Sequence, residues 1–293
     1  MVDLRPMEVG EVLDGTFTLY RRHFSLFLKV SVAVMWLPVA VGVYVRLHFM
    51  SGDPQQVALS MKDNVTGFVL LMFLLVVLNG IAGLLLTATS IHIISASYLG
   101  RAPSFAEALS LAGSKIVRLF LVSLGKGMLL VLIWIGGALG VVALSALGKL
   151  LGTAVAVLLG MGGGGALLWF ICFVLCGYGV TTPTVVLEDL SSSFDAFGRS
   201  WELTRGFKLK VLGLASVAYL IAQIVPLGAM SVLGNFSTGQ GAVAQTVAIV
   251  VSALVPILLA PIIPCVLTLL YYDLRVRREA FDLQLLGQQL GMT

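Results

Sequence analysis

Histidine and cysteine are the residues of this sequence that could most readily bind a metal or support catalysis, and both are sparse. The three histidines, His23, His48 and His92, are well separated, and the sequence has no HExxH motif, phosphate-binding GxxxxGK[ST] loop or GxSxG turn. Cys172 and Cys176 would share one helix face, but a zinc site needs further nitrogen or sulfur ligands, and none lies nearby. We therefore predict no catalytic, cofactor-binding or metal site, and interpret the cysteines as small apolar packing residues.

Three polar residues inside long apolar runs are the remaining candidates for chemistry within a membrane. They are Asn79, His92 and Gln223. Asn79 and Gln223 could join helices by hydrogen bonds, whereas His92 could line a cavity or lie at the membrane interface. No Asp or Glu falls inside the predicted spans, which argues against a proton- or sodium-coupled carrier, although backbone carbonyls can replace acidic groups in such sites.

The elements that position these residues belong to a membrane protein, because the composition is far more apolar than that of soluble domains. Of the 293 residues, 59% are apolar and 11% charged, whereas soluble domains have about 45–50% and about 25%. The mean hydropathy of +1.04 agrees with this interpretation. The net charge of +4 is too small to indicate nucleic-acid binding, so we expect membrane lipids as partners, with a cytoplasmic or membrane protein as a further candidate.

Six long apolar runs predict an all-α fold with six transmembrane helices, since about 20 apolar residues suffice to cross a bilayer. The predicted spans are residues 24–44, 65–95, 119–144, 154–180, 211–233 and 243–270.

Glycines and prolines interrupt two of these spans. Residues 162–165 are four glycines, which we interpret as packing or kink positions, with an unwound substrate site as the alternative. Two glycine pairs have the i,i+4 spacing of closely packed helices: Gly136 with Gly140, and Gly160 with Gly164. The sixth span should bend or lose hydrogen bonds at its three prolines. These are Pro256, Pro261 and Pro264.

A short charged amphipathic segment followed by a long apolar run occurs three times. The three units cover approximately residues 8–98, 104–190 and 192–283. Each unit would contain one amphipathic helix and two spans within a single polytopic membrane domain, 1–293. A helix with one apolar and one charged face commonly lies in the membrane interface, although packing on neighbouring helices is an alternative.

The basic residues predict the orientation of the chain. Of the 18 Lys and Arg residues, all except Arg46, Lys62 and Lys149 fall on the side of the amphipathic segments. By the positive-inside rule, both termini and all three segments lie in the cytoplasm. We therefore predict a cytoplasmic collar that binds a partner protein or anionic lipid headgroups. Its candidate residues are Arg21, Arg22, Lys115, Arg118, Arg199, Arg205, Arg275, Arg277 and Arg278.

Two features allow a simpler interpretation of these charges. Lys29, Lys126 and Lys210 lie just inside spans or directly before one, where a lysine could mark a functional site, but each is close enough to the interface to reach the headgroups. The acidic residues of the collar have bases nearby, so internal salt bridges and solvated faces are the alternative to a binding surface.

Three segments carry a family resemblance. They read GEVLDGTFTLYRRHF at 10–24, RSWELTRG at 199–206 and YYDLRVRREAFDL at 271–283. Together they resemble the prokaryotic family named after the membrane domain of glycerophosphoryl diester phosphodiesterase. The resemblance covers nearly the whole chain and is most specific in the last segment, where Ala280 replaces the glycine that commonly precedes Phe-Asp-Leu in that family.

The resemblance implies a stand-alone membrane domain in the prokaryotic cytoplasmic (inner) membrane. The family takes its name from fusions with a catalytic barrel, which needs roughly 250 residues of βα repeats. Six spans and their flanks use all 293 residues, so no catalytic residue is carried over.

We therefore expect a non-enzymatic membrane scaffold or accessory protein with a cytoplasmic amphipathic collar and no cofactor. A permease or a lipid-handling transporter or channel is the alternative, favoured by the glycines at 162–165 and the prolines of the sixth span. An intramembrane phosphodiesterase is the hypothesis we favour least, because it would require clustered acids or histidines.

Overall fold

The structure of the chain is a computed structural model that describes residues 6–49, 62, 64–237 and 241–279. The regular elements in these ranges are all helices, and six helical stretches are long and apolar enough to cross a membrane. They are Phe24–Phe49, Val65–Tyr98, Phe105–Leu151, Thr153–Leu187, Lys208–Leu233 and Thr246–Glu279. The protein is therefore an all-α, multi-pass membrane protein, as predicted.

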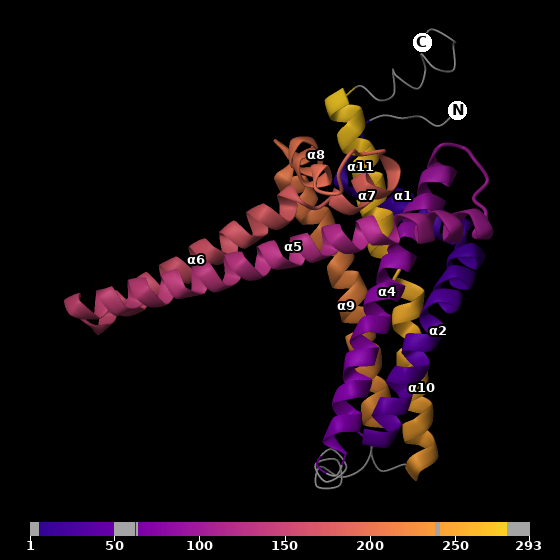
Figure 1. Cartoon of the computed structure of the whole chain (residues 1–293), viewed down its shortest axis with the longest axis horizontal. Helices are drawn as coiled ribbons and strands as arrows, with labels where there is room; N and C mark the ends of the chain where they lie inside the picture. Colours follow the sequence, from indigo (N-terminus) through magenta and orange to yellow (C-terminus); the bar gives the residue numbers. More distant parts are fainter. Residues whose placement is uncertain (1–5, 50–61, 63, 238–240, 280–293) are drawn as a thin grey trace. The chain divides into compact units, whose positions relative to one another are not determined.

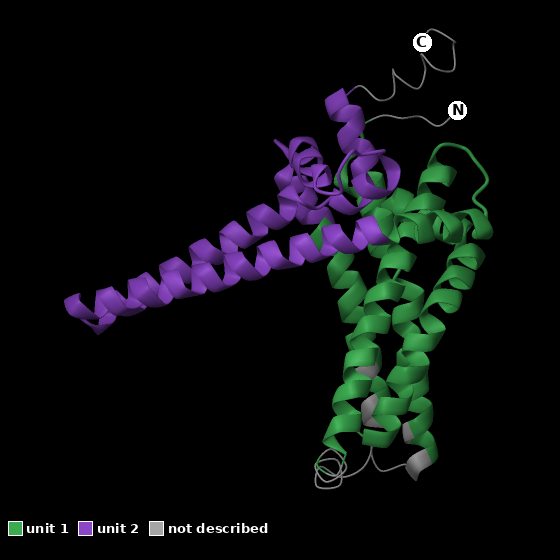
Figure 2. Cartoon of the chain, viewed as in Figure 1, with its two compact units in different colours: residues 1–116, 215–269 green, residues 117–214, 270–293 purple. Residues whose placement is uncertain are grey.

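The chain forms two compact units, which Figure 2 shows in different colours. Unit 1 comprises Met1–Ile116 and Ala215–Leu269, and unit 2 comprises Val117–Leu214 and Leu270–Thr293. The boundaries of the units fall within helices and do not follow the predicted repeats. The threefold repeat and the single domain over 1–293 therefore remain predictions.

Unit 1 is built around helix α2 (Phe24–Phe49), which packs against α4 (Val65–Tyr98) and α10 (Gly241–Leu259) (Figure 1). The residue before α2, His23, places its Nε2 atom 2.7 Å from the hydroxyl oxygen of Ser97 near the end of α4. The start of α2 therefore lies beside the end of α4, and the two helices run antiparallel.

One of the three prolines of the sixth predicted span, Pro261, separates two helices in unit 1, whereas Pro256 and Pro264 lie inside helices. Helix α10 ends before Pro261 and α11 (Ile262–Glu279) begins after it, because proline has no backbone N–H and its ring clashes with the preceding turn. Tyr20, from the amphipathic helix α1 (Val9–Arg22), donates its hydroxyl to the carbonyl of Leu258 at 2.6 Å. The predicted bend is therefore a break, and α1 packs beside it.

Unit 2 contains a long helical hairpin made of α5 (Phe105–Gly148, from residue 117 onward) and α6 (Thr153–Gly177), which lie side by side (Figure 1). A single 3₁₀ turn, Lys149–Leu151, joins them, and Gly152 completes the reversal with a φ of 122°, which favours glycine. The amphipathic segment predicted at 104–115 is not a separate helix, since α5 continues through it without a break.

Glycines bring α5 and α6 close together, but mostly at positions other than those predicted. An added Cβ at Gly148 would lie 2.8 Å from the Cα of Ala156, and one at Gly163 would lie 3.2 Å from Val141. Of the predicted pairs, Gly160 contacts α5 through Ser145. The other three have open space around an added Cβ: Gly136, Gly140 and Gly164. Helix α6 is continuous through the four successive glycines, so the unwound alternative is wrong.

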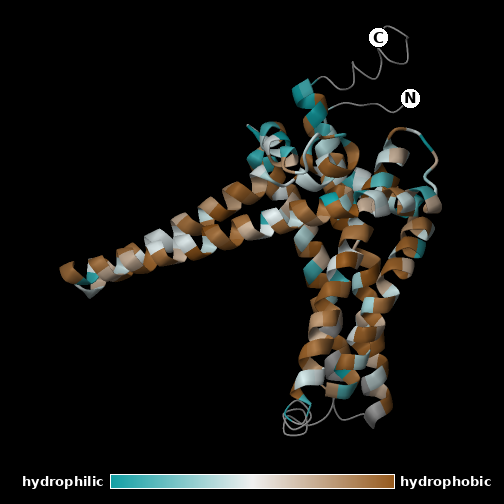
Figure 3. Cartoon of the chain, viewed as in Figure 1, coloured by the Kyte–Doolittle hydropathy of each residue, from teal (hydrophilic) through white to brown (hydrophobic). Residues whose placement is uncertain are grey.

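The outward faces of this hairpin are apolar (Figure 3). None of the residues in the most apolar 18-residue stretch of α5 is buried, and 6% are buried in the corresponding stretch of α6. So large an exposed apolar surface is not stable in water, whereas lipid chains can cover it.

Two short helices cover the end of α6 in unit 2. Helix α7 (Thr181–Leu187) packs against α8 (Asp195–Thr204), and α8 also packs against α6. The Asp195 carboxylate accepts the hydroxyl of Ser191 at 2.7 Å and the backbone N–H of Ser192 at 2.8 Å. These hydrogen bonds lower the pKa of Asp195 and connect the start of α8 to the segment before it.

Candidate functional site

The second half of α11, in unit 2, presents two rows of polar side chains. Residues spaced i,i+4 share one face of a helix, so each row meets a different neighbour. One row consists of Tyr271, Arg275 and Glu279, and the other of Asp273 and Arg277.

The first row completes a ring of five hydrogen-bonded side chains. The Glu188 carboxylate, directly after α7, accepts Arg199 Nε at 3.0 Å and the Tyr271 hydroxyl at 2.7 Å. Arg275 donates to the Tyr271 oxygen at 3.4 Å and to the Glu279 carboxylate at 3.0 Å. Glu279 also pairs with the far side of the Arg199 guanidinium, which closes the ring. Two arginines and two glutamates thus neutralise one another.

The second row contains a carboxylate with no exposed surface. Asp273 is 0% exposed, and its oxygen lies 2.5 Å from Nζ of Lys210, at the start of α9 (Lys208–Ser237). Arg277 Nε donates to both Asp273 oxygens at 3.1 Å. A buried carboxylate is costly unless it is paired and hydrogen-bonded, so this contact fixes α9 against α11.

The segment 199–206 attaches α8 to the end of α6. The hydroxyls of Ser200 and Thr204 both donate to the carbonyl of Gly177, at 2.9 and 3.1 Å. The indole of Trp201 covers Gly177 so closely that an added Cβ would overlap it. The segment quoted for the family resemblance therefore has a structural role at nearly every position.

An ammonium group lies in the corner between two aromatic rings beside this contact. Lys208 Nζ is 3.2 Å from the ring centroid of Phe173 and 3.5 Å from that of Trp201. Such cation–π contacts stabilise a positive charge over a ring face. They join the start of α9 to α6 and α8.

The charges of the ring, Glu188, Arg199, Tyr271, Arg275 and Glu279, favour a structural role. Burial works against the charge of Arg199, but hydrogen bonds and charges from Glu188 and Glu279 outweigh it and raise the pKa of Arg199. Glu188 and Glu279 each already accept hydrogen bonds or ion pairs from two other members of the ring. The ring therefore suits holding helices together better than transferring protons.

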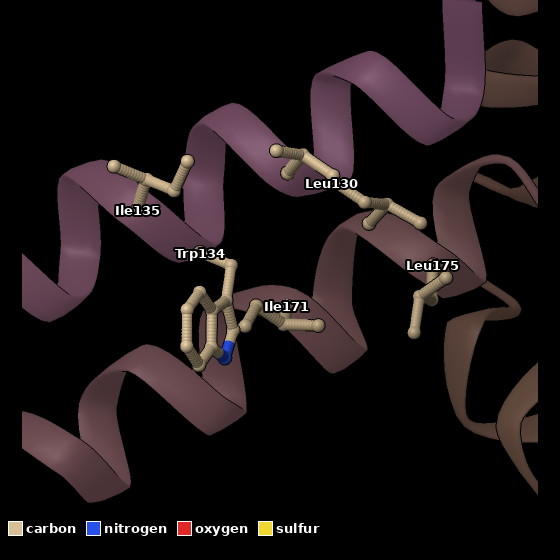
Figure 4. A pocket seen from close by; sticks show the side chains of 6 residues that line it. Leu130, Trp134, Ile135, Ile171 and Leu175 are labelled. Atoms are coloured by element: carbon tan, nitrogen blue, oxygen red, sulfur yellow. The ribbon is translucent and has the colours of Figure 1, made fainter. Parts of the chain in front are cut away.

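The second feature of unit 2 is an apolar groove between α5 and α6, with a volume of about 430 Å³ (Figure 4). Its lining consists of Leu130, Val131, Trp134, Ile135, Ile171 and Leu175. All six are aliphatic or aromatic, and Figure 4 shows the Trp134 ring beside Ile171. A hydrocarbon chain matches such a lining, in which the indole N–H of Trp134 is the one polar side-chain group.

The predicted collar residues of unit 2 divide into two groups. Three are partners in internal salt bridges: Arg199, Arg275 and Arg277. Arg278 donates to the backbone carbonyl of Arg205. The side chains of Arg118 and Arg205 are exposed. The first three therefore have counter-charges within the chain, and binding of lipid or a partner protein by the collar stays a prediction.

In unit 1 the collar residues lie on two helices. Arg21 and Arg22 are exposed in the last turn of α1, and Lys115 is half-buried on α5. Their binding role also stays a prediction.

The three predicted intramembrane polar residues do not come together. Asn79 donates to the carbonyl of Leu75 in its own helix at 2.8 Å, not to a neighbouring helix as predicted. His92 places Nε2 3.7 Å from the carboxylate of Glu107 in unit 1. Gln223 is exposed on α9.

Sequence reasoning missed Glu188 as a member of the ring. No local pattern identifies it, because its partners Arg199 and Tyr271 lie 11 and 83 residues away. Lys208 was missed too, although a signal existed: it lies two residues after the Trp201-containing segment that ends at Gly206.

Metal-binding residues do not cluster in the described part of the chain. Within those residues, no group of three His, Cys, Asp or Glu side chains could hold a metal ion. Cys172 is exposed and Cys176 is buried, and both are free thiols.

Comparison of the chain with protein-family models, with curated proteins and with solved structures finds no match in any of the three. The family resemblance of the segments 10–24, 199–206 and 271–283 therefore stays a prediction.

Proposed function

We propose that the protein is a non-enzymatic scaffold or accessory protein of a prokaryotic cytoplasmic membrane, with both termini in the cytoplasm. The observation that carries this proposal is the ring of Glu188, Arg199, Tyr271, Arg275 and Glu279 in unit 2. Its side chains satisfy one another and join three separate segments of the chain. Such a fixed assembly supplies a rigid platform for a partner.

The platform carries cations that can face a partner or the lipid headgroups. They are Arg118 and Arg205, which are both exposed in unit 2. Exposed Arg and Lys beside a membrane attract anionic lipids or acidic protein surfaces. The distribution of basic residues along the sequence supports a cytoplasmic location for these groups.

The test is purification in a mild detergent followed by mass spectrometry of the proteins that remain bound. The variant reverses Arg118 and Arg205 to Glu, because reversing Arg199 or Arg275 would break the ring and test folding. The matched control is Lys149→Glu, at the turn between α5 and α6. We expect a stoichiometric partner protein with the wild type and the control, and its loss with the double variant. A partner retained by the double variant, or no stoichiometric partner with the wild type, would contradict the proposal.

A second candidate is a lipid-handling transporter or channel, which the apolar groove between α5 and α6 favours. Its test is reconstitution into vesicles whose labelled lipids are quenched from outside. Exchange of lipid between leaflets, lost when Val131→Trp fills the groove, would support this candidate. An exchange rate equal to that of empty vesicles would exclude it.

A further inference from the structure

A lysine that sequence reasoning placed within reach of the membrane interface lies beyond one end of the apolar groove. Lys126 lies one helical turn before Leu130, and residues spaced i,i+4 share a helix face. The rise of a helix puts the two Cα atoms about 6 Å apart along α5. On the other wall of the groove, Tyr178 follows Leu175 by three residues.

The lysine bridges the two walls at this end. Lys126 Nζ donates to the backbone carbonyl of Tyr178 at 3.1 Å, so the ammonium lies between α5 and the end of α6. The neighbouring Gly125 is covered by Phe194, whereas Gly127 has open space around an added Cβ. The ammonium is therefore held in place against the end of α6.

Lys126 differs from Lys208 and Lys210 in the group that its ammonium contacts. Lys210 pairs with the Asp273 carboxylate, and Lys208 lies against two aromatic rings. Within the described residues, no carboxylate lies within ion-pairing distance of Lys126, whose hydrogen-bond partner is a neutral carbonyl. A half-buried ammonium without a counter-charge favours an anion beside it.

We propose that this groove and Lys126 together bind one anionic phospholipid, with an acyl chain along the groove and the phosphate against the ammonium. The six apolar residues of the lining match the chain, and the single cation at the end matches the headgroup. The site goes beyond the scaffold proposal and does not depend on it, because a bound lipid is compatible with any partner.

The selectivity of the site must come from the headgroup. Acyl chains are as apolar as the leucine side chains of a helix, so the groove alone gains little over the bilayer. One Lys or Arg near the membrane surface contributes an attraction that corresponds to about a fivefold preference for an anionic lipid. The magnitude of the preference is therefore set by Lys126.

Native mass spectrometry in a mild detergent tests this site. The full chain is supplied with equal amounts of phosphatidylglycerol and phosphatidylcholine of the same acyl chains, and retained lipids are counted. We expect about a fivefold excess of phosphatidylglycerol on the wild type. Lys126→Gln should abolish the preference, Lys126→Arg should keep it, and Val131→Trp should lower retention of both lipids.

The matched control is Lys149→Gln, which removes a lysine from the opposite end of the same hairpin and should retain the wild-type preference. Monodisperse elution of Lys126→Gln separates a lost headgroup contact from misfolding, and rescue by Lys126→Arg does so again. An unchanged preference in Lys126→Gln would overturn the proposal. So would equal retention of the two lipids by the wild type, or a dimer that occupies the groove and dissociates in Val131→Trp.

Discussion

Individual side chains in unit 2 matter through the partners they satisfy. The Glu188 side chain is 16% exposed and accepts hydrogen bonds from Arg199 and Tyr271. Removal of one member of such a ring leaves the other members partly unpaired, which costs more than the net value of the hydrogen bonds themselves. The same logic applies to Asp273, whose buried carboxylate depends on Lys210 and Arg277.

Glu188→Ala should lower the free energy of unfolding by about 2 kcal/mol, because it leaves a guanidinium and a hydroxyl without their acceptor in a half-buried site. Glu202→Ala is the matched control, since Glu202 is exposed on α8, and it should change stability by less than about 0.5 kcal/mol. The measurement is reversible unfolding in mixed micelles. Equal stabilities of the two variants would show that the ring contributes nothing.

His23 gives unit 1 a predicted dependence on pH. Burial, and then the nearby charge of Arg22, lower the pKa of His23 below its ordinary value. Folding therefore favours the neutral imidazole: its contribution is full above about pH 6.5, the unfolded value, and is lost as the pH falls toward the folded pKa. We expect the melting temperature to fall between pH 7.5 and pH 5, and to fall less in His23→Gln.

The control for this experiment is His48→Gln, because His48 lies at the opposite end of α2 and stacks on Tyr44. It should keep the wild-type response to pH. If His23→Gln and the wild type lose the same amount of stability, the pH dependence arises elsewhere.

At the scale of helices, the sequence predicted which segments are helical better than it predicted where each helix begins and ends. The six spans followed from hydropathy alone, since an apolar run of about 20 residues has few alternatives to a membrane helix. A bend or a loss of hydrogen bonds at the three prolines of the sixth span was predicted, because proline has a local effect on the backbone, but a break between two helices at Pro261 was not. The continuity of α5 through 105–119 was not predicted. The change from charged to apolar residues there also fits a boundary between an interfacial helix and a span, and hydropathy alone does not distinguish the two arrangements.

The spacing of the glycines did not predict which faces of α5 and α6 contact each other. Several glycines have the spacing of closely packed helices, and the sequence does not say which of them face the partner helix. The contact depends on how each helix is rotated about its axis. Gly148 faces the backbone of α6, whereas Gly140 faces open space.

Gly148→Ala should therefore destabilise the hairpin by about 1–3 kcal/mol, because the new Cβ meets backbone atoms of Ala156 that cannot move aside. Gly140→Ala should be neutral or stabilising by up to about 1 kcal/mol, since alanine is the better helix former. Unfolding in mixed micelles again gives the comparison. A larger loss in Gly140→Ala than in Gly148→Ala would mean that the other face is in contact.

At the scale of the whole molecule, the sequence predicted the fold class but not the candidate site, and the orientation of the chain stays a prediction. Composition determines that the chain enters a membrane, and basic residues bias which side they stay on. The ring could not be predicted, because its members are far apart in sequence and meet only after the helices have packed. The groove could not be predicted either, since aliphatic residues line it as they line every other face of the hairpin.

Cysteine labelling tests the orientation of the whole chain. In a variant with Ala at Cys172, Cys176 and Cys265, single cysteines would be placed at Leu150 and at Glu202. Leu150 is 83% exposed at the turn between α5 and α6. A membrane-impermeant reagent added to intact cells should label Leu150→Cys, and should label Glu202→Cys only after the membrane is opened.

A third cysteine at Gly10, which is exposed in α1, provides the control for unit 1 and should behave as Glu202→Cys does. The reverse pattern would invert the topology and would place the collar outside the cell. Labelling of all three positions in intact cells would point to leakage.

The separation between the two halves of the ring also has a consequence for biosynthesis. Glu188 and Arg199 leave the ribosome early, but Tyr271 bonds to Glu188 across 83 residues of sequence. At a synthesis rate of about 5–20 residues per second, Tyr271 is made roughly 4–17 s after Glu188. A nascent chain that stalls in this interval can form the ion pair between Glu188 and Arg199, but it lacks the partners that Tyr271 and Glu279 supply.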